Sequence, residues 1–272
     1  YLIMEKQALS LGRFDECVAQ IQNLLDKNYA SEMSHEEYSK SHAKAYYNPV
    51  FFIHPKGKRT RLIWDLAAKI KGKCLNDYIL SGPNLYNNLM ELIFKMREHK
   101  FMFKSDIQEM FHQIKVDDDD TNALRFLFRF HPNDKIKVYK LNVLPFGASC
   151  SPVISQYVKD KVAEDYKDKN PIPCQLIQKS CYVDDIVTSV ENKEEAVNLV
   201  VDIKRILKEG GFNLLKINSN SNEVLEKIKN KLTDEELSDL NVISNQDKEK
   251  ILGYDMNFLT DELSVASCLN KI

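Results

Sequence analysis

The sequence of 272 residues lacks features that define several common protein classes. No uninterrupted apolar run reaches the length of a membrane-spanning helix, so we expect no membrane segment. The N-terminus lacks the basic region and apolar core of a signal peptide. The six cysteines are scattered, with no C-x-x-C spacing and no Cys/His cluster. That pattern argues against a zinc site and favours free thiols in a reducing compartment.

Familiar motifs of hydrolases and nucleotide-binding proteins are also missing. There is no G-x-S-x-G nucleophile motif and no G-x-x-x-x-G-K-[ST] phosphate loop. We find no internal repeat and no low-complexity linker. The first residue is Tyr1 rather than Met, and we expect the sequence to be a piece of a longer chain.

The composition is that of a soluble globular protein, with 43% hydrophobic and 29% charged residues. The length suits one large domain or two intertwined ones. A net charge of −2 argues mildly against nucleic-acid binding, but the charge is uneven. Basic residues gather between Lys56 and Lys73 against a single acid, Asp65, whereas acids gather at 117–120. A basic groove beside an acidic site is compatible with this mean, and we interpret the run 117–120 as a solvated turn.

Residue patterns predict an α+β fold with antiparallel sheets, because strands and helices are segregated rather than alternating. Helices are expected over 13–27, 35–45 and 85–96, after Ser151, over 193–209 behind an Asn192 cap, and after caps at Ser221 and Thr233. Strands are expected at 49–53, 61–65, 101–106, 124–130, 136–141, 175–180, 186–190, 213–217 and from Ile251 onward.

Two adjacent carboxylates, Asp184 and Asp185, interrupt a stretch that favours strands on both sides. A tight hairpin with this pair at its tip would bring both side chains to one site. Neighbouring carboxylates repel, and an oxygen-only site suits Mg²⁺ or Mn²⁺ as the counter-charge. The alternative is a solvated acidic turn. Asp106 also ends a hydrophobic strand, and a third carboxylate beside the pair could hold two divalent ions for nucleotidyl transfer.

Four sequence boxes occur in an order that resembles one family. They are Leu75-Asn76-Asp77 with Gly82-Pro83-Asn84-Leu85, Asp106–Ile114 (DIQEMFHQI), Leu144–Pro152 (LPFGASCSP) and Tyr182-Val183-Asp184-Asp185. Over residues 46–259 the chain resembles the reverse transcriptase of retroelements, specifically the Pao/BEL group of long-terminal-repeat retrotransposons. The resemblance implies an RNA-directed DNA polymerase, a nucleotidyltransferase that uses two Mg²⁺ (or Mn²⁺) ions.

The resemblance also assigns roles to matching positions. Asp106, Asp184 and Asp185 would be the catalytic carboxylates, with Asp106 and Asp184 the principal metal ligands and the Ile107 carbonyl completing the coordination. The implied nucleotide-binding residues are Lys56 or Lys58, Arg61, Phe111, Phe146, Gly147, Gln156 and Lys216. Phe111 would exclude a 2′-hydroxyl, with core packing as the alternative. Lys216 would protonate the leaving pyrophosphate, with a solvated strand lysine as the alternative. Leu252, Gly253 and Tyr254 would begin the primer grip, where Met256 replaces the Trp common in the group.

The implied architecture is a right-hand polymerase with an antiparallel palm sheet and its thumb largely missing. Fingers would comprise 1–82 and 114–150, and palm 83–113 and 151–259. Residues 260–272 would begin the connection to an absent thumb. RNase H and integrase regions are not present, and no D-[ST]-G triplet of an aspartic protease occurs, so the resemblance implies part of a longer Pol polyprotein.

The implied partners are an RNA or DNA template with its primer, dNTPs, and no membrane. The implied location is cytoplasmic, in a virus-like particle, with room for a nuclear phase. Two alternatives stay open. The first is a catalytically inactive nucleic-acid-binding remnant or isolated fragment. The second is an RNA-dependent RNA polymerase, whose Asp pair usually follows Gly rather than Tyr182-Val183.

Overall fold

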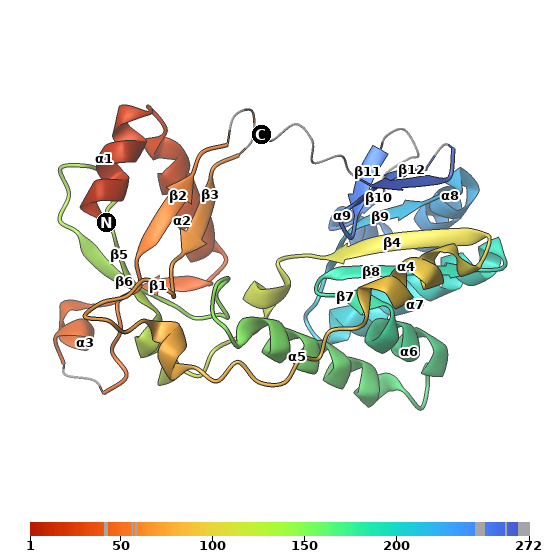
Figure 1. Ribbon diagram of the computed structural model, residues 1–272, viewed down its shortest axis with the longest axis horizontal. Coiled ribbons are helices and arrows are strands. Elements are labelled where there is room, and N and C mark those ends of the chain that lie inside the picture. The colour runs from red at the N-terminus through yellow and green to blue at the C-terminus, as the bar shows by residue number, and fades with distance from the viewer. Residues whose placement is uncertain (41–42, 56, 58, 243–247, 259, 266–272) are drawn as a thin grey trace. The chain divides into compact units, whose positions relative to one another are not determined.

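The computed structural model describes the chain apart from residues 41–42, 56, 58, 243–247, 259 and 266–272 (Figure 1). The chain forms two compact units, each made of two separated stretches of sequence. The first unit comprises Tyr1–Pro83 and Phe111–Val153, and the second comprises Asn84–Met110 and Ile154–Ile272. The expected boundaries at 82, 113 and 150 lie within three residues of these. That the units act as fingers and palm stays a prediction.

The first unit combines short helices with two small antiparallel sheets. Its helices are α1 (Leu2–Ser10), α2 (Phe14–Asp26), α3 (His35–Ser39), and the 3₁₀ helices η1 (Leu75–Tyr78), η2 (Met110–Gln113) and η3 (Asp120–Leu124). One sheet has the order β1 (Ala30–Glu32), β6 (Lys137–Leu141), β5 (Arg125–Phe128). The other is the hairpin of β2 (Val50–Ile53) and β3 (Arg61–Trp64), which confirms the expected hairpin.

Aromatic side chains form the core of the first unit. Phe126 lies edge-on to Trp64 with ring centroids 4.9 Å apart and stacks on Tyr139 at 5.4 Å. Helix α2 buries Phe14 and Ile21 in the same core, because apolar residues recur along one face. Each such buried aromatic contributes a large apolar area, which compensates for the small size of the two sheets.

The acidic run that was interpreted as a solvated turn leads into η3. The Lys44 ammonium lies 2.6 Å from a carboxylate oxygen of Asp119 and 2.6 Å from one of Asp120. The Asp117 carboxylate accepts a hydrogen bond from the Asp119 amide. Acidic groups are favourable at the start of a helical turn, so part of this run has a structural role.

The second unit is built on a five-stranded sheet of order β10-β9-β4-β8-β7. The strands are β10 (Asn241–Val242), β9 (Leu214–Ser219), β4 (Phe101–Ile107), β8 (Asp185–Val190) and β7 (Cys181–Tyr182). The helices are α4 (Leu89–Glu98), α5 (Ser151–Tyr166), α6 (Pro171–Lys179), α7 (Lys193–Glu209), α8 (Asn222–Lys231) and α9 (Asp234–Ser238). A three-stranded sheet follows, of β11 (Lys248–Ile251), β12 (Tyr254–Asn257) and β13 (Glu262–Val265). Pairing is antiparallel except between β10 and β9.

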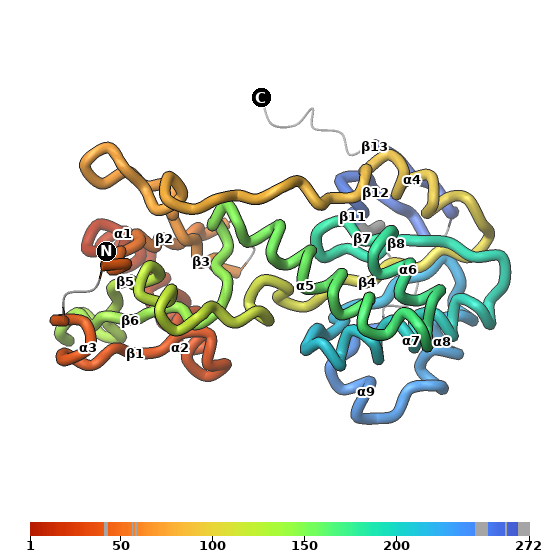
Figure 2. The backbone as a smooth tube through the Cα atoms, turned by 90° about the horizontal axis from the view of Figure 1, so that it is seen from below, coloured from red at the N-terminus to blue at the C-terminus, as the bar shows by residue number. Residues whose placement is uncertain are grey.

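The two faces of the five-stranded sheet are covered differently. On one face, Met102 and Val187 join an apolar cluster with Ile251, Met256 and Phe258 of the three-stranded sheet and its continuation. Helix α7 covers the other face (Figure 1). Figure 2 shows α8 beside α7, and ion pairs such as Lys227 with Glu194 join these two helices. Strand residues two apart share a face, so β4 presents Met102, Lys104 and Asp106 toward the same side.

Several helix starts follow the expected capping residues. The Asn192 side chain accepts a hydrogen bond from the Glu195 amide and caps α7, and Ser221 caps α8 in the same way. Thr233 forms a capping box with Glu236. Helix α4 begins at Leu89 rather than 85, because Asn88 accepts hydrogen bonds from the first turn and so caps the helix there.

The expected strand at 175–180 is wrong, because these residues lie mostly in α6. Pro171 opens this helix, and Pro173, Cys174 and Ile177 are buried at helical spacing. The Asn87 side-chain amide donates to the carbonyls of Gln178 and Cys181, which ties the end of α6 to the start of β7. The strand before the Asp pair is therefore only Cys181–Tyr182.

Within the described residues, no helix has the length and apolarity that a membrane crossing requires. Five cysteines, Cys17, Cys74, Cys150, Cys174 and Cys181, are free thiols. Cys268 lies outside the described residues.

Candidate active site

Strand register places four polar side chains in one row across the five-stranded sheet. Lys216 of β9 is paired with Asp106 of β4, Asp106 with Asp185 of β8, and Asp185 with Tyr182 of β7. Directly opposed residues on neighbouring strands project from the same face. The row, called the carboxylate row below, thus brings together a predicted lysine and two of the three predicted carboxylates.

The Asp pair lies at the tip of a tight hairpin, as expected. Val183 and Asp184 connect β7 to β8, and Val183 adopts a φ of 56°, which is strained for a β-branched residue. The Ile107 amide donates to the Asp184 carbonyl at 2.8 Å, which fixes the turn against the end of β4. The Cys181 thiol donates to the Val183 carbonyl at 3.3 Å, and burial raises the pKa of this thiol to about 11. The thiol therefore keeps the proton that this hydrogen bond needs.

Lys104 is a member of the site that the sequence analysis missed. Its ammonium nitrogen lies 3.0 Å from Asp106 Oδ1 and 3.2 Å from Asp185 Oδ1. The residue is only 4% exposed. Its position two residues before Asp106 was the available signal, because residues i and i+2 of a strand share a face.

Burial and neighbouring charges shift the pKa values of Asp106 and Asp185 in opposite directions. Burial opposes ionisation of Asp106, but a hydrogen bond with Asp185 and the nearby Lys104 and Lys216 outweigh it and lower the Asp106 pKa. Burial, followed by the hydrogen bond and charge of Asp106, raises the pKa of Asp185 to about 7. Near neutral pH the pair consequently shares a proton, with Asp106 as the ionised partner.

Asp184 differs from the other two carboxylates because its residue surface is exposed. Partial removal from water, together with the charge of Asp106, raises the pKa of Asp184. In the described part of the chain, no three acidic, histidine or cysteine side chains gather closely enough to hold a metal ion. The carboxylate that meets Asp106 directly is Asp185. The expectation that Asp184, rather than Asp185, is a principal metal ligand beside Asp106 stays a prediction.

The donor set nevertheless fits a hard divalent cation. Asp106 Oδ1 is buried and accepts no hydrogen bond of good geometry, although the Lys104 ammonium lies close to it. Carboxylate oxygens are the ligands that Mg²⁺ and Mn²⁺ prefer. Asp106 and Asp185 could supply the first ligands, and Asp184 stays the predicted third ligand.

The second unit also contains the predicted nucleotide-binding residue Gln156 and the predicted primer-grip residues. Gln156 of α5 is 1% exposed, and neither atom of its amide group has a hydrogen-bond partner within the described residues. Leu252 and Gly253 form the two-residue turn between β11 and β12, with φ of 51° and 89°. Leu252 also packs against the apolar cluster that covers the sheet. The turn geometry that a primer-grip hairpin would need is therefore present, while its role stays a prediction.

In the first unit, two predicted nucleotide-pocket residues pack on each other. The rings of Phe111 and Phe146 lie 4.8 Å apart, and Phe111 is 8% exposed. Gly147 has a φ of 99°, and a Cβ atom there would lie 2.7 Å from the Trp64 carbonyl oxygen. A contact within the fold therefore requires this glycine. Arg61 is exposed at the start of β3.

Lys56 and Lys58 lie outside the described residues. Their choice as the partner of Arg61 therefore stays open, as it was in the sequence analysis.

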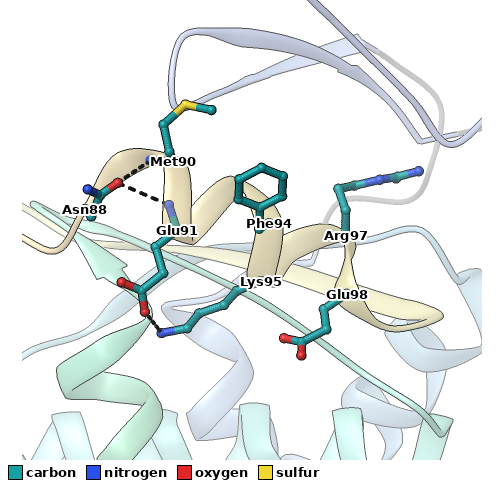
Figure 3. Close-up of a pocket in the computed structure, with 7 residues that line it drawn as sticks. All are labelled: Asn88, Met90, Glu91, Phe94, Lys95, Arg97 and Glu98. Atoms are coloured by element: carbon teal, nitrogen blue, oxygen red, sulfur yellow. Dashed lines mark hydrogen bonds and ion pairs between the residues drawn. The ribbon is translucent and has the colours of Figure 1, made fainter.

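A pocket of about 730 Å³ lies on α4, and none of the predicted site residues lines it. Figure 3 shows Met90 and Phe94 in its lining, and the Phe94 residue is 68% exposed. The Glu91–Lys95 ion pair borders it, and Arg97 pairs with Asp261 beside it. Its lining carries no cluster of groups suited to phosphoryl transfer, so it is a different surface from the carboxylate row.

Comparison with protein families decides the family of this chain. Residues 60–259 match the family model described as reverse transcriptase (RNA-dependent DNA polymerase). The chain belongs to the reverse transcriptase family. The matched range contains the whole carboxylate row, the Asp-pair hairpin and the β11–β12 turn.

Curated relatives of this reverse transcriptase chain are transposon polyproteins. The Transposon Tf2-3 polyprotein of Schizosaccharomyces pombe is 27% identical over 162 residues, which is 59% of this chain and 10% of the relative. The Transposon Tf2-7 polyprotein of the same yeast is 26% identical over the same length. The chain thus spans about a tenth of the length of these relatives. The matches support a retrotransposon reverse transcriptase, while the expected Pao/BEL subgroup stays a prediction.

Proposed function

We propose that this domain adds deoxynucleotides to a primer 3′-hydroxyl under the direction of an RNA or DNA template. The single observation that carries this proposal is the carboxylate row, in which Asp106 and Asp185 meet next to Lys216. Membership of the reverse transcriptase family supports the same chemistry. The reaction class is nucleotidyl transfer, which needs carboxylate-held divalent ions rather than a Ser or Cys nucleophile.

The residues of the row would each have a defined part. Asp106, Asp185 and Asp184 would hold two Mg²⁺ or Mn²⁺ ions, and the Ile107 carbonyl would add a ligand. Bound divalent ions would supply Lewis acidity toward the attacking hydroxyl and the leaving phosphate. Lys216 lies in register with Asp106, where an ammonium group could donate a proton to the leaving pyrophosphate.

Residues of the first unit would select and bind the nucleotide. Arg61 is exposed, and a guanidinium suits bidentate phosphate recognition. Phe111 and Phe146 would form the aromatic wall that excludes a ribose 2′-hydroxyl. Gly147 would bring backbone close to the nucleotide. In the second unit, the buried amide of Gln156 on α5 is the group that the resemblance assigns to nucleotide binding.

The wider setting is also proposed. Relatives that match are transposon polyproteins of which this chain spans a tenth, so the domain would act within a longer polyprotein with thumb, RNase H and integrase regions. It would belong to a long-terminal-repeat retrotransposon, with the Pao/BEL group as the expected subgroup. It would work in a cytoplasmic virus-like particle with a nuclear phase. Template and primer binding would rest on phosphate contacts and weaken with salt.

Primer extension tests the proposed reaction. The chain is assayed with a primed RNA or DNA template, dNTPs and Mg²⁺ or Mn²⁺, as wild type and as Asp106→Asn. Loss of a metal ligand removes several kcal/mol of transition-state stabilisation, so activity should fall on the order of a thousandfold. Asp117→Asn, which removes an exposed carboxylate of the first unit, is the control and should retain activity.

Two outcomes would count against the enzyme. If the wild-type chain is inactive, the same pair of variants is compared within the longer polyprotein. No extension there either would support the inactive-remnant alternative. Equal activity of wild type and Asp106→Asn would place the chemistry elsewhere.

The RNA polymerase alternative has its own test. Phe111→Ala should let rNTPs compete with dNTPs, because the aromatic wall would no longer meet the 2′-hydroxyl. Incorporation of rNTP and dNTP is measured for wild type and variant under single-turnover conditions. Leu124→Ala, a comparably buried apolar truncation in the same unit, controls for lost packing and should leave the ratio unchanged. Unchanged discrimination in Phe111→Ala would contradict the steric role.

A further inference from the structure

The Lys104 ammonium occupies the position where a cation would be expected to neutralise the carboxylates. It lies 3.0 Å from Asp106 Oδ1 and 3.2 Å from Asp185 Oδ1, and thus bridges the two acids. The side chain is 6% exposed, whereas those of Asp106 and Asp185 are 24% and 25% exposed. The lysine is therefore held beneath the pair, on the protein side, while the carboxylates keep an accessible edge.

Strand geometry explains why the ammonium is held there. Lys104 lies between Met102 and Asp106 on one face of β4, and is paired with Val187 of β8. Met102 and Val187 belong to the apolar cluster under the three-stranded sheet. The aliphatic part of a lysine tolerates such surroundings, but its charge must reach a polar partner. From this strand position, the carboxylate row supplies that partner.

We propose that Lys104 is a built-in counter-ion of the Asp106–Asp185 pair, which holds the pair together before a divalent ion binds and then competes with that ion for the carboxylate oxygens. The inference rests on the proposed function, because it assumes that these carboxylates bind divalent cations. Lys104 is on this view a positioning residue. It lowers the affinity of the site for divalent ions and stabilises the folded protein when no ion is bound.

Electrostatics makes the competition a necessary consequence. Two carboxylates in contact repel unless a proton or cation lies between them. An ammonium already in contact with both reduces the negative potential that attracts a second cation. It also shares the oxygen Asp106 Oδ1, the buried atom without a well-formed hydrogen bond. Removing the lysine should therefore destabilise the metal-free protein and strengthen metal binding together, a pairing of effects that lost packing alone would not produce.

Mn²⁺ binding to the full chain tests this inference. Free Mn²⁺ is measured by electron paramagnetic resonance at pH 8 for wild type, Lys104→Met and Lys104→Arg, alongside melting curves with and without Mn²⁺. We expect Lys104→Met to bind Mn²⁺ about tenfold more tightly than wild type, a change of about 1.4 kcal/mol. Without metal, its melting temperature should be lower than that of wild type, and adding Mn²⁺ should raise it by more than in wild type. Lys104→Arg keeps the charge and should bind Mn²⁺ like wild type.

A matched control separates site chemistry from packing. Lys159 is also buried, at 0% exposure, and its ammonium lies 2.8 Å from Asp160 Oδ1. Lys159→Met should lose stability without any change in Mn²⁺ affinity. Lys104→Gln is measured in parallel, so that the affinity comparison survives if Lys104→Met does not fold.

The possible results distinguish this inference from the proposed function. Equal or weaker Mn²⁺ binding by Lys104→Met and Lys104→Gln, with binding abolished in Asp106→Asn, would overturn the counter-ion role alone. Absence of Mn²⁺ binding in every variant would overturn the metal site and the counter-ion role together. Tighter binding by the lysine variants would support the counter-ion even if primer extension failed.

Discussion

The carboxylate row and the basic hairpin β2–β3 hold their charged groups in opposite ways. In the row, Asp106 and Asp185 are fixed by strand pairing and by ion pairs of 3.0 and 3.2 Å with Lys104. In the hairpin, Arg59 and Arg61 are exposed near its tip. The row is therefore organised by folding itself, whereas the hairpin presents charge that only a bound ligand would organise. Substitutions should separate these two modes.

The base of the hairpin is more constrained than its tip, and Gly147→Ala should show this with the largest loss of stability. Gly147 has a φ of 99°, and an added Cβ would lie 2.7 Å from the carbonyl oxygen of Trp64, the last residue of β3. Backbone strain and the clash together should cost about 2–3 kcal/mol. Thermal denaturation followed by circular dichroism measures the effect.

Gly72→Ala is the matched control for Gly147→Ala. Gly72 has a φ of 82°, but nothing lies within 4 Å of an added Cβ. This variant keeps the strain and omits the clash, so it should cost only about 1 kcal/mol. Equal losses in the two variants would mean that Trp64 moves aside freely. In that case the base of the hairpin is as adaptable as its tip.

Arg61→Ala should act on ligand binding with little effect on folding. The residue is exposed at the start of β3, and we expect its removal to raise the KM for dNTP about tenfold, the effect of losing a charge-assisted phosphate contact. The melting temperature should not change. Arg59→Ala, an exposed neighbour of the same charge, should have a smaller effect on KM. Equal increases in KM in both variants would indicate general electrostatic attraction of the dNTP and no specific phosphate contact by Arg61.

Part of this arrangement follows from sequence rules and part does not. Capping by Asn192 and the hairpin at Val183-Asp184 were predictable, because short-range signals determine both. The helical state of 175–179 was not, because a short apolar run such as Leu176-Ile177 fits a strand or a buried helix equally well. Pro171 at the helix start was the discriminating signal.

The partner of Asp106 depends on long-range register, which no local pattern determines. The pairing of Asp106 with Asp185 follows from how β4 and β8 align, and the register between β4 and β9 shifts just after Asp106. The need for glycine at position 147 also depends on long-range structure, because the neighbouring Trp64 is 83 residues away in the chain. The presence of Lys104 in the site, by contrast, could have been found from strand alternation alone.

The smallest expected effect concerns the proton that Asp106 and Asp185 share. Burial and the neighbouring Asp106 raise the pKa of Asp185 to about 7 in the folded chain, against about 3.9 when unfolded. The folded form thus holds a proton that the unfolded form releases, so stability without metal should fall as pH rises from about 4 to about 7 and then level off.

Asp185→Asn cannot ionise and escapes this loss. In excess EDTA its melting temperature should exceed that of wild type by about 2–4 °C at pH 8, on the order of 1 kcal/mol, and by less at pH 5. For Asp184→Asn, at the exposed position, the difference in melting temperature from wild type should depend less on pH. If the difference between Asp185→Asn and wild type is the same at both pH values, the pair does not share a proton.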